Sequence, residues 1–132
     1  MVSELRRPRP HGGVVAWLKS VSDEDLHLSA VTLGELQAGV EITRAQDPAK
    51  AGAIEAWVDQ IAEAHAVLPI DGRCLRMWAR LLRGKSDELI EDGMIAATAV
   101  VHQLTVVTRN VRDYSQFPVK TLDPFAVGRG RR

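Results

Sequence analysis

Segments with the pattern of β-strands alternate along this chain with segments that have the pattern of α-helices, and this restricts its possible folds more than any other feature. Apolar and polar side chains alternate over residues 26–30, a short apolar run covers residues 65–70, and β-branched side chains predominate in residues 104–108. Apolar residues at helical spacing occupy the stretches between them, and a last short strand follows Pro118. This order predicts an α/β fold, a three-layer α/β/α sandwich with a mainly parallel sheet.

Polar residues and proline mark where the helices begin. Thr32 and Glu35 have the spacing of a capping box, in which the two side chains close a helix N-terminus. Pro48 fits the first turn of the next helix, and Asp71 is expected to cap a third. Residues 87–102 are expected to form a fourth helix that leads directly into a strand.

The length and composition fit one domain, residues 1–132, with 45% hydrophobic and 26% charged side chains. No apolar run approaches the ~18–20 residues that span a bilayer, and the charged start lacks the apolar stretch of a secretory signal, so we expect no membrane contact. The single cysteine, Cys74, agrees with a cytoplasmic location. Basic residues gather in residues 1–12 and 126–132, which we expect to be flexible ends.

Seventeen basic and seventeen acidic side chains leave no net charge, so any site for a polyanion must be local. This balance, with few aromatic residues, disfavours a plain nucleic-acid-binding domain. Four arginines fall within about 80° of one another on a helical wheel: Arg73, Arg76, Arg80 and Arg83. They form either a solvated helix face or a contact for the RNA backbone.

Four polar side chains lie near the strand ends, where α/β proteins place their chemistry: Glu35, Asp92, Asn110 and Asp113. Each has a structural alternative. Glu35 can complete the capping box, and Asp92 can stabilise a helix N-terminus. Asn110 and Asp113 are common turn formers. We expect Glu35 and Asp92 to approach each other across a cleft, and oxygens that converge in this way repel unless a hard cation such as Mg²⁺ or Mn²⁺ lies between them.

Three sequence segments carry a family resemblance: SAVTLGELQAGV, EDGMIAATA and VVTRNVRDYSQF. In this order and at these distances they resemble the PIN-domain family, and within it the VapC- and FitB-like toxins of bacterial toxin–antitoxin pairs. The resemblance implies a magnesium-dependent endoribonuclease that hydrolyses RNA with metal-activated water, forms a homodimer and is held inactive by a cognate antitoxin.

The same resemblance implies a role for each candidate residue. Glu35 and Asp92 take the places of metal ligands, and Asp113 is a further candidate ligand. Asn110 and Asp113 orient metal-bound water, and which of them is nearer to the metal stays open. Thr108 is expected to form a hydrogen bond within the site.

The chain departs from the family pattern at its start. Family members open with a hydrophobic strand that ends in an Asp-Thr-Asn motif and supplies the first metal-site acid, whereas this sequence opens with MVSELRRPRP. We therefore expect the natural coding sequence to extend upstream of Met1, and the 132-residue form to be a weak or inactive nuclease. The alternative function is a catalytically inert PIN-like module that only binds antitoxin or itself.

Overall fold

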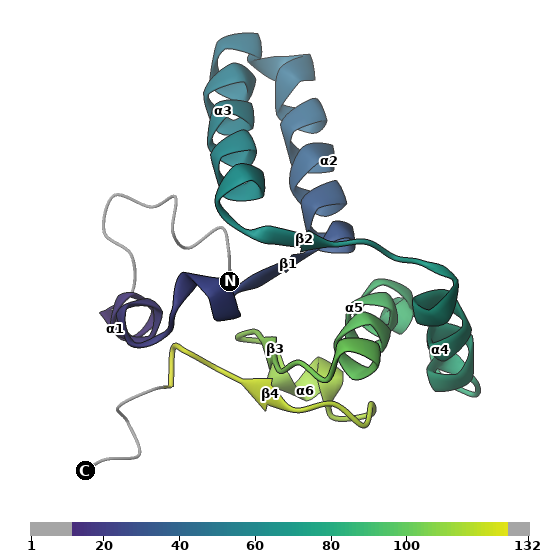
Figure 1. Ribbon diagram of the computed structural model, residues 1–132. Coiled ribbons are helices and arrows are strands. Elements are labelled where there is room, and N and C mark those ends of the chain that lie inside the picture. Colours follow the sequence, from purple (N-terminus) through teal and green to yellow (C-terminus); the bar gives the residue numbers. More distant parts are fainter. Residues whose placement is uncertain (1–11, 127–132) are drawn as a thin grey trace. The chain divides into compact units, whose positions relative to one another are not determined.

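The structure is a computed structural model and describes residues 12–126 (Figure 1). These residues divide into two compact units, each described by itself. The central unit is Asp23–Ile70, and the terminal unit comprises residues 12–22 and 71–126. The predicted flexible ends, apart from Gly12 and Ala126, lie outside the described residues. Among the helices of residues 12–126, none is both long and apolar enough to span a membrane.

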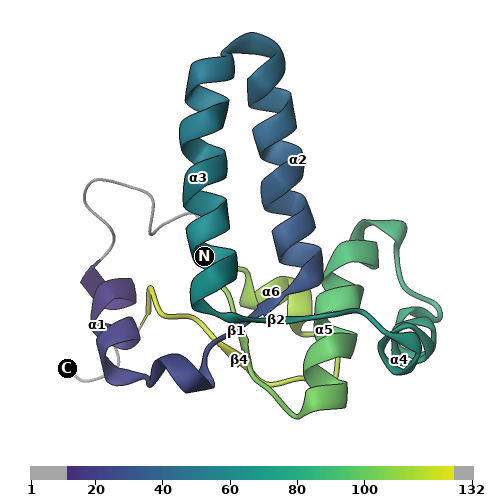
Figure 2. The same cartoon turned by 45° about the horizontal axis from the view of Figure 1, so that its top comes forward.

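The central unit is a helical hairpin on a pair of short strands. Its elements are η2 (Asp23–Asp25), β1 (His27–Ser29), α2 (Ala30–Gln46), α3 (Pro48–Ala64) and β2 (Ala66–Leu68). The strands are parallel, with Leu28 opposite Val67. Figure 2 shows α2 and α3 alongside each other, with β1 and β2 at their base. The predicted strands and the Pro48 helix start are confirmed.

The start of α2 differs from the predicted one. Ser29 caps this helix, and its hydroxyl accepts a hydrogen bond from the Val31 N–H at 3.1 Å. Thr32 is therefore the third helical residue and Glu35 lies in the second turn, so the predicted capping box is wrong. The reason is that β1 leads directly into the helix, and its last residue, Ser29, already has the extended backbone that a cap requires.

The two hairpin helices share a small apolar core. Val40 of α2 packs with Ala51 and Val58 of α3, and all three side chains are buried. Asp47 ends α2 and caps α3 by accepting a hydrogen bond from the Lys50 N–H at 3.1 Å. One residue thus closes both helices at the turn, which keeps the connection short.

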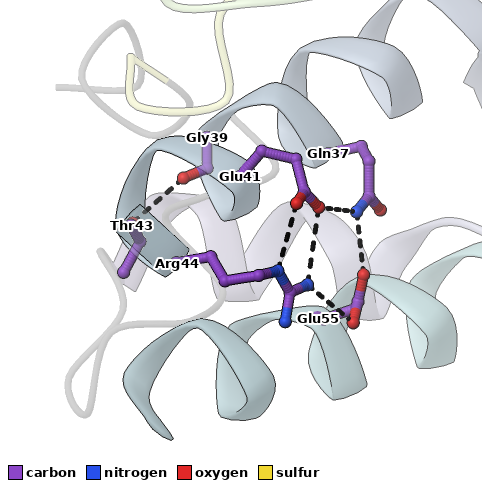
Figure 3. Close-up of polar contacts among 6 residues, drawn as sticks. All are labelled: Gln37, Gly39, Glu41, Thr43, Arg44 and Glu55. Carbon is purple, nitrogen blue, oxygen red and sulfur yellow. Dashed lines mark hydrogen bonds and ion pairs between the residues drawn. The ribbon is translucent and has the colours of Figure 1, made fainter. Parts of the chain in front are cut away.

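A polar cluster joins the same two helices at the surface (Figure 3). Gln37 donates hydrogen bonds of 2.8 Å to both Glu41 and Glu55, and Arg44 pairs with Glu41 at 3.1 Å and Glu55 at 2.9 Å. The hydrogen bond from Arg44, and then that from Gln37, lowers the pKa of Glu41. Because the cluster is largely solvated, we expect it to set the register of the hairpin rather than to supply much of its stability.

The terminal unit contains the remaining elements. They are α1 (Gly12–Ser20), α4 (Gly72–Leu82), η3 (Asp87–Leu89), α5 (Ile90–His102), β3 (Val106–Val107), α6 (Val111–Tyr114) and β4 (Thr121–Leu122). Asp71 caps α4 as predicted, accepting a hydrogen bond from the Cys74 N–H at 3.0 Å. The helix predicted over residues 87–102 begins with a 3₁₀ turn, and its α-helical part starts at Ile90.

The strands of residues 12–126 form two separate parallel pairs, β1 with β2 and β3 with β4. In the second pair Val106 lies opposite Thr121, and the Thr108 N–H donates a hydrogen bond of 2.9 Å to the Leu122 carbonyl. The predicted α/β class and parallel pairing are therefore confirmed. Among the described residues no strand hydrogen-bonds to both pairs, so the four strands form two sheets of two strands each.

Helices α4 and α5 pack against each other through a close contact at a glycine. The Trp78 indole N–H donates a hydrogen bond of 3.1 Å to the Ile90 carbonyl, and Gly93 lies beneath the same ring. Farther along α5, Ala96 and Ala99 enter a core that also contains Leu89, Val106, Tyr114 and Phe117. The small residues of α5 thus let its neighbours approach closely.

Gly93→Ala is expected to destabilise the terminal unit by about 1–3 kcal/mol, the usual cost of overpacking. An added Cβ would lie 3.2 Å from Trp78 Cδ1 and 3.4 Å from Leu82 Cδ1, and Trp78 is held by its hydrogen bond. Gly52→Ala in α3 is the matched control, because nothing lies within 4 Å of its Cβ. This control should stabilise the protein by about 0.5–1 kcal/mol, since glycine is unfavourable inside a helix. Urea denaturation compares the two, and a stabilised Gly93→Ala would contradict the tight contact.

Candidate functional site

Asp92 is held in a defined orientation by a buried tyrosine. It is the third residue of α5, and its half-buried carboxylate accepts a hydrogen bond of 3.3 Å from the Tyr114 hydroxyl. The Tyr114 ring belongs to the core of the terminal unit, so the position of its hydroxyl is fixed by packing. The carboxylate of Asp92 therefore points toward α6 rather than freely into solvent.

The electrostatic surroundings of Asp92 disfavour its ionised form. Burial is the main cause that raises the pKa of Asp92, and the negative charges of Asp113 and Glu91 raise it further. The hydrogen bond from Tyr114 lowers the pKa of Asp92 but does not cancel the other effects. A partly buried carboxyl group kept near other acids, with a raised pKa, is typical of functional sites.

The loop after β3 carries the other two candidates of this unit. The Thr108 hydroxyl accepts a hydrogen bond of 3.0 Å from the Asn110 N–H. Asn110 occupies the N-cap position of α6, but its side chain makes no capping hydrogen bond. Asp113 joins the turn through its backbone N–H, which donates to the Asn110 carbonyl at 3.0 Å. The exposed side-chain oxygens of Asn110 and Asp113 are thus not used to close α6.

The structure places Asp92, Asn110 and Asp113 in the terminal unit, where α6 packs against α5 and the charge of Asp113 acts on Asp92. Glu35 lies in the central unit, exposed in the second turn of α2 and without the capping role that the sequence had offered it. Its approach to Asp92 stays a prediction. Within the described residues, neither unit on its own holds a group of three or more His, Cys, Asp or Glu side chains placed to bind a metal ion.

Tyr114 is a site residue that the sequence patterns do not predict. This residue is the only tyrosine of the chain and directly follows Asp113. Since a buried tyrosine usually needs a partner for its hydroxyl, its place beside a candidate acid was a usable signal. The partner itself, 22 residues away in the sequence, depends on how α6 packs against α5.

Asp92→Asn is expected to raise the free energy of unfolding at neutral pH. The pKa of Asp92 is higher in the folded state, so the folded state binds the proton more tightly and wild-type stability falls as pH rises between the unfolded and folded pKa values. Asparagine carries no charge, so it removes this loss of stability, and its side-chain oxygen still accepts a hydrogen bond from Tyr114. The gain in the free energy of unfolding should disappear below the unfolded pKa of about 3.9. Urea unfolding across this pH range measures it, and a gain that is independent of pH would contradict an electrostatic cause.

Known proteins are similar to this chain in sequence and in fold. The PIN domain family matches residues 1–119. Toxin FitB of Neisseria gonorrhoeae is 34% identical over 133 residues, which cover 95% of this chain and 94% of FitB. The VapC ribonuclease Y4jK of Sinorhizobium fredii is 31% identical over 136 residues, covering 95% of this chain and 93% of that protein.

Solved structures show the same likeness in three dimensions. The crystal structure of FitAcB from Neisseria gonorrhoeae aligns with a TM-score of 0.82 and 34% identity over 94% of this chain and 93% of that chain. The structure of FitAB bound to the IR36 DNA fragment aligns with a TM-score of 0.80 and 32% identity over 94% and 90%. Because the family match covers most of the sequence and the relatives match along nearly their whole length, the chain belongs to the PIN-domain family.

Proposed function

We propose that this protein is a toxin-type endoribonuclease that hydrolyses RNA phosphodiester bonds with metal-activated water. The observation that carries the proposal is the half-buried carboxylate of Asp92, which Tyr114 orients and which lies within the electrostatic influence of Asp113. It occurs in a chain whose relatives include proteins named as toxin FitB and as VapC ribonucleases. The chemistry at Asp92 and the family membership thus favour the same activity.

The candidate residues have the chemistry that a hard divalent cation requires. Carboxylate and carboxamide oxygens are the ligands that Mg²⁺ and Mn²⁺ prefer. The raised pKa of Asp92 reflects the desolvation and crowded negative charge that a cation would offset. We propose that Glu35, Asp92 and Asp113 hold Mg²⁺, with Mn²⁺ as a substitute, and that the bound ion supplies a water of lowered pKa.

Several residues of the chain would position the metal ligands and the attacking water. Tyr114 fixes the direction of the Asp92 carboxylate, and the Thr108 hydroxyl fixes the backbone of Asn110. Asn110 and Asp113 then orient the attacking water through their exposed side-chain oxygens. The reaction needs no covalent intermediate, because water attacks the phosphorus directly.

We also propose that a cognate antitoxin neutralises the protein. Solved relatives include a FitAB assembly bound to a DNA fragment. The family resemblance implies a small antitoxin for this chain as well. We place the pair in the cytoplasm, where its RNA substrate is found.

A homodimer is expected for the free protein. Ile42 of α2 is 69% exposed and Leu75 of α4 is 42% exposed, so both side chains leave apolar surface in contact with water. Burying them against a second copy would remove apolar surface from water. Light scattering at micromolar concentration should give twice the 14.5 kDa mass of one chain. The mass of a single chain would contradict the expectation.

The activity is tested by incubating the purified chain with end-labelled structured RNA and Mg²⁺. The assay uses micromolar protein and long incubation so that slow cleavage is also detected. Attack by water should yield fragments without a 2′,3′-cyclic phosphate, and added antitoxin should suppress them. Tight binding of antitoxin with no cleavage at all would instead support the inert PIN-like module.

A further inference from the structure

We propose that the α4 arginine face, defined as Arg73, Arg76 and Arg80 of α4 with Arg83 at its C-cap, binds the phosphodiester backbone of the RNA substrate outside the cleavage site. This inference rests on the proposed function, since it assigns a surface to the substrate of that activity. The RNA is expected to lie along α4 and to be gripped through its phosphates, without selection of sequence.

The α4 arginine face is exposed and not used by the fold. All four side chains are exposed. Within residues 12–126, none of these four side chains takes part in a hydrogen bond or an ion pair. Arg73 acts only at longer range on Asp71, whose pKa is lowered mainly by the hydrogen bond from the Cys74 backbone and further by this arginine. Four guanidinium groups are thus available for a partner.

Within residues 12–126, positive charge is concentrated on this helix. Residues 72–85 contain five basic residues and no acid, whereas the rest of the chain has twelve basic and seventeen acidic side chains. The fifth, Lys85, lies over the Phe117 ring at 5.7 Å and so already has an intramolecular contact. Outside residues 72–85, the range 12–126 contains only six basic but sixteen acidic side chains, so within this range a polyanion should be drawn to the α4 arginine face.

The opposite side of α4 is anchored to the core of the terminal unit, which holds the arginine face in place. Trp78 bonds to the Ile90 carbonyl at 3.1 Å and packs over Gly93. Leu81 and Leu82 pack against the buried cluster around Ala96. Figure 1 shows α4 beside α5, the helix that carries these contacts. Because the helix cannot rotate about its axis without breaking them, the arginines are preorganised as a line.

The spacing of this line suits a nucleic acid strand. At 1.5 Å per residue, the ten-residue step from Arg73 to Arg83 extends about 15 Å. A strand that rises about 3.4 Å per nucleotide presents four or five phosphates over that length. Arginine is also the side chain that binds phosphate in a bidentate manner.

A protein partner fits the α4 arginine face less well. Protein interfaces usually have an apolar centre, whereas this face consists of four charged side chains with no apolar residue among them. Binding of an acidic antitoxin segment is therefore an outcome of the test and not the proposal.

The test measures RNA affinity in EDTA, where no metal-dependent cleavage can occur. Fluorescence anisotropy follows binding of a fluorescein-labelled, unstructured 20-nucleotide RNA to the wild type and to Arg76→Gln/Arg80→Gln. We expect the double variant to raise Kd at least tenfold. The slope of log affinity against log salt should fall by about 1.4, since each contact to a single strand contributes about 0.7. In the cleavage assay KM should rise while kcat stays unchanged, because neither arginine is part of the proposed catalytic site.

The matched control is Lys19→Gln/Lys50→Gln, which removes the same charge from exposed positions on α1 and α3. Its Kd should change less than twofold. An equal loss of affinity in the control, or an unchanged salt slope in the arginine variant, would overturn the proposal. So would a loss of antitoxin binding with RNA affinity intact.

The binding and cleavage assays together distinguish failure of the α4 arginine face from failure of the proposed nuclease activity. RNA binding that depends on the arginines, without any cleavage in Mg²⁺, would support the α4 arginine face and reject the nuclease. Cleavage in Mg²⁺ with KM unchanged in the arginine variant would reject the α4 arginine face and leave the nuclease standing.

Discussion

Asp92→Asn and Glu35→Gln should each reduce the rate of RNA cleavage on the order of 100-fold or more, the loss typical when one interaction that stabilises the transition state is removed, because each carboxylate would help to hold the stabilising cation. Each substitution keeps the size of the side chain and removes its charge, so the metal ion would lose a negative ligand. Asp92→Asn also keeps the acceptor for Tyr114, which separates loss of charge from loss of orientation. The measurement is the initial rate of cleavage of a labelled RNA in Mg²⁺.

Two other exposed acids, one from each unit, provide matched controls for these variants. Glu91 precedes Asp92 in α5 and is exposed, and Glu63 is exposed near the end of α3. Glu91→Gln and Glu63→Gln remove the same charge but should leave the rate within a few-fold of the wild type, because neither residue is a proposed ligand. Equal losses in the controls would show that net charge, rather than the ligand set, governs the rate.

Phe117→Ala should lower the free energy of unfolding by about 3–5 kcal/mol, as for other large aromatic side chains removed from a core. Phe117 is 5% exposed, packs with Leu89 and Val106, and its ring lies 6.5 Å from that of Tyr114 at a tilted angle. Such a loss is a large part of the ~5–15 kcal/mol stability of a typical domain. The cavity should also loosen Tyr114, so the variant is expected to lose activity at temperatures where it is still folded.

Urea denaturation followed by tryptophan fluorescence measures this effect. Val111→Ala is the control, since Val111 is 37% exposed at the start of α6 and surface substitutions usually change stability by less than about 0.5 kcal/mol. A loss of less than about 1 kcal/mol for Phe117→Ala would contradict its place in the core.

Local chemistry in the sequence was sufficient for some boundaries of the fold and not for others. Pro48 and Asp71 predicted helix starts correctly, because each acts on the backbone within three residues of itself. The helix start predicted at Thr32 is wrong because Ser29, three residues earlier, is an equally good capping residue. The choice between them depends on where β1 ends, and that end is set by pairing with β2 far along the chain.

The candidate site shows the same division between local and distant causes. Asp92, Asn110 and Asp113 were identified from their positions and from the family resemblance, and the structure places them in one unit. Tyr114 was missed because its bond to Asp92 exists only when α6 packs on α5. The raised pKa of Asp92 has the same origin, since burial and the charge of Asp113 come from tertiary packing.

Metal-dependent RNA cleavage by this protein is measured most directly by the cleavage rate while the metal ion is removed and then returned. The wild-type protein is assayed in Mg²⁺, then in excess EDTA, and then after Mg²⁺ is restored, with Asp92→Asn treated in the same way. Cleavage by the wild type should stop in EDTA and return with Mg²⁺, and Asp92→Asn should cleave little RNA at any stage. Cleavage that persists in EDTA, or that Asp92→Asn retains in full, would contradict a metal-dependent nuclease with Asp92 in its site.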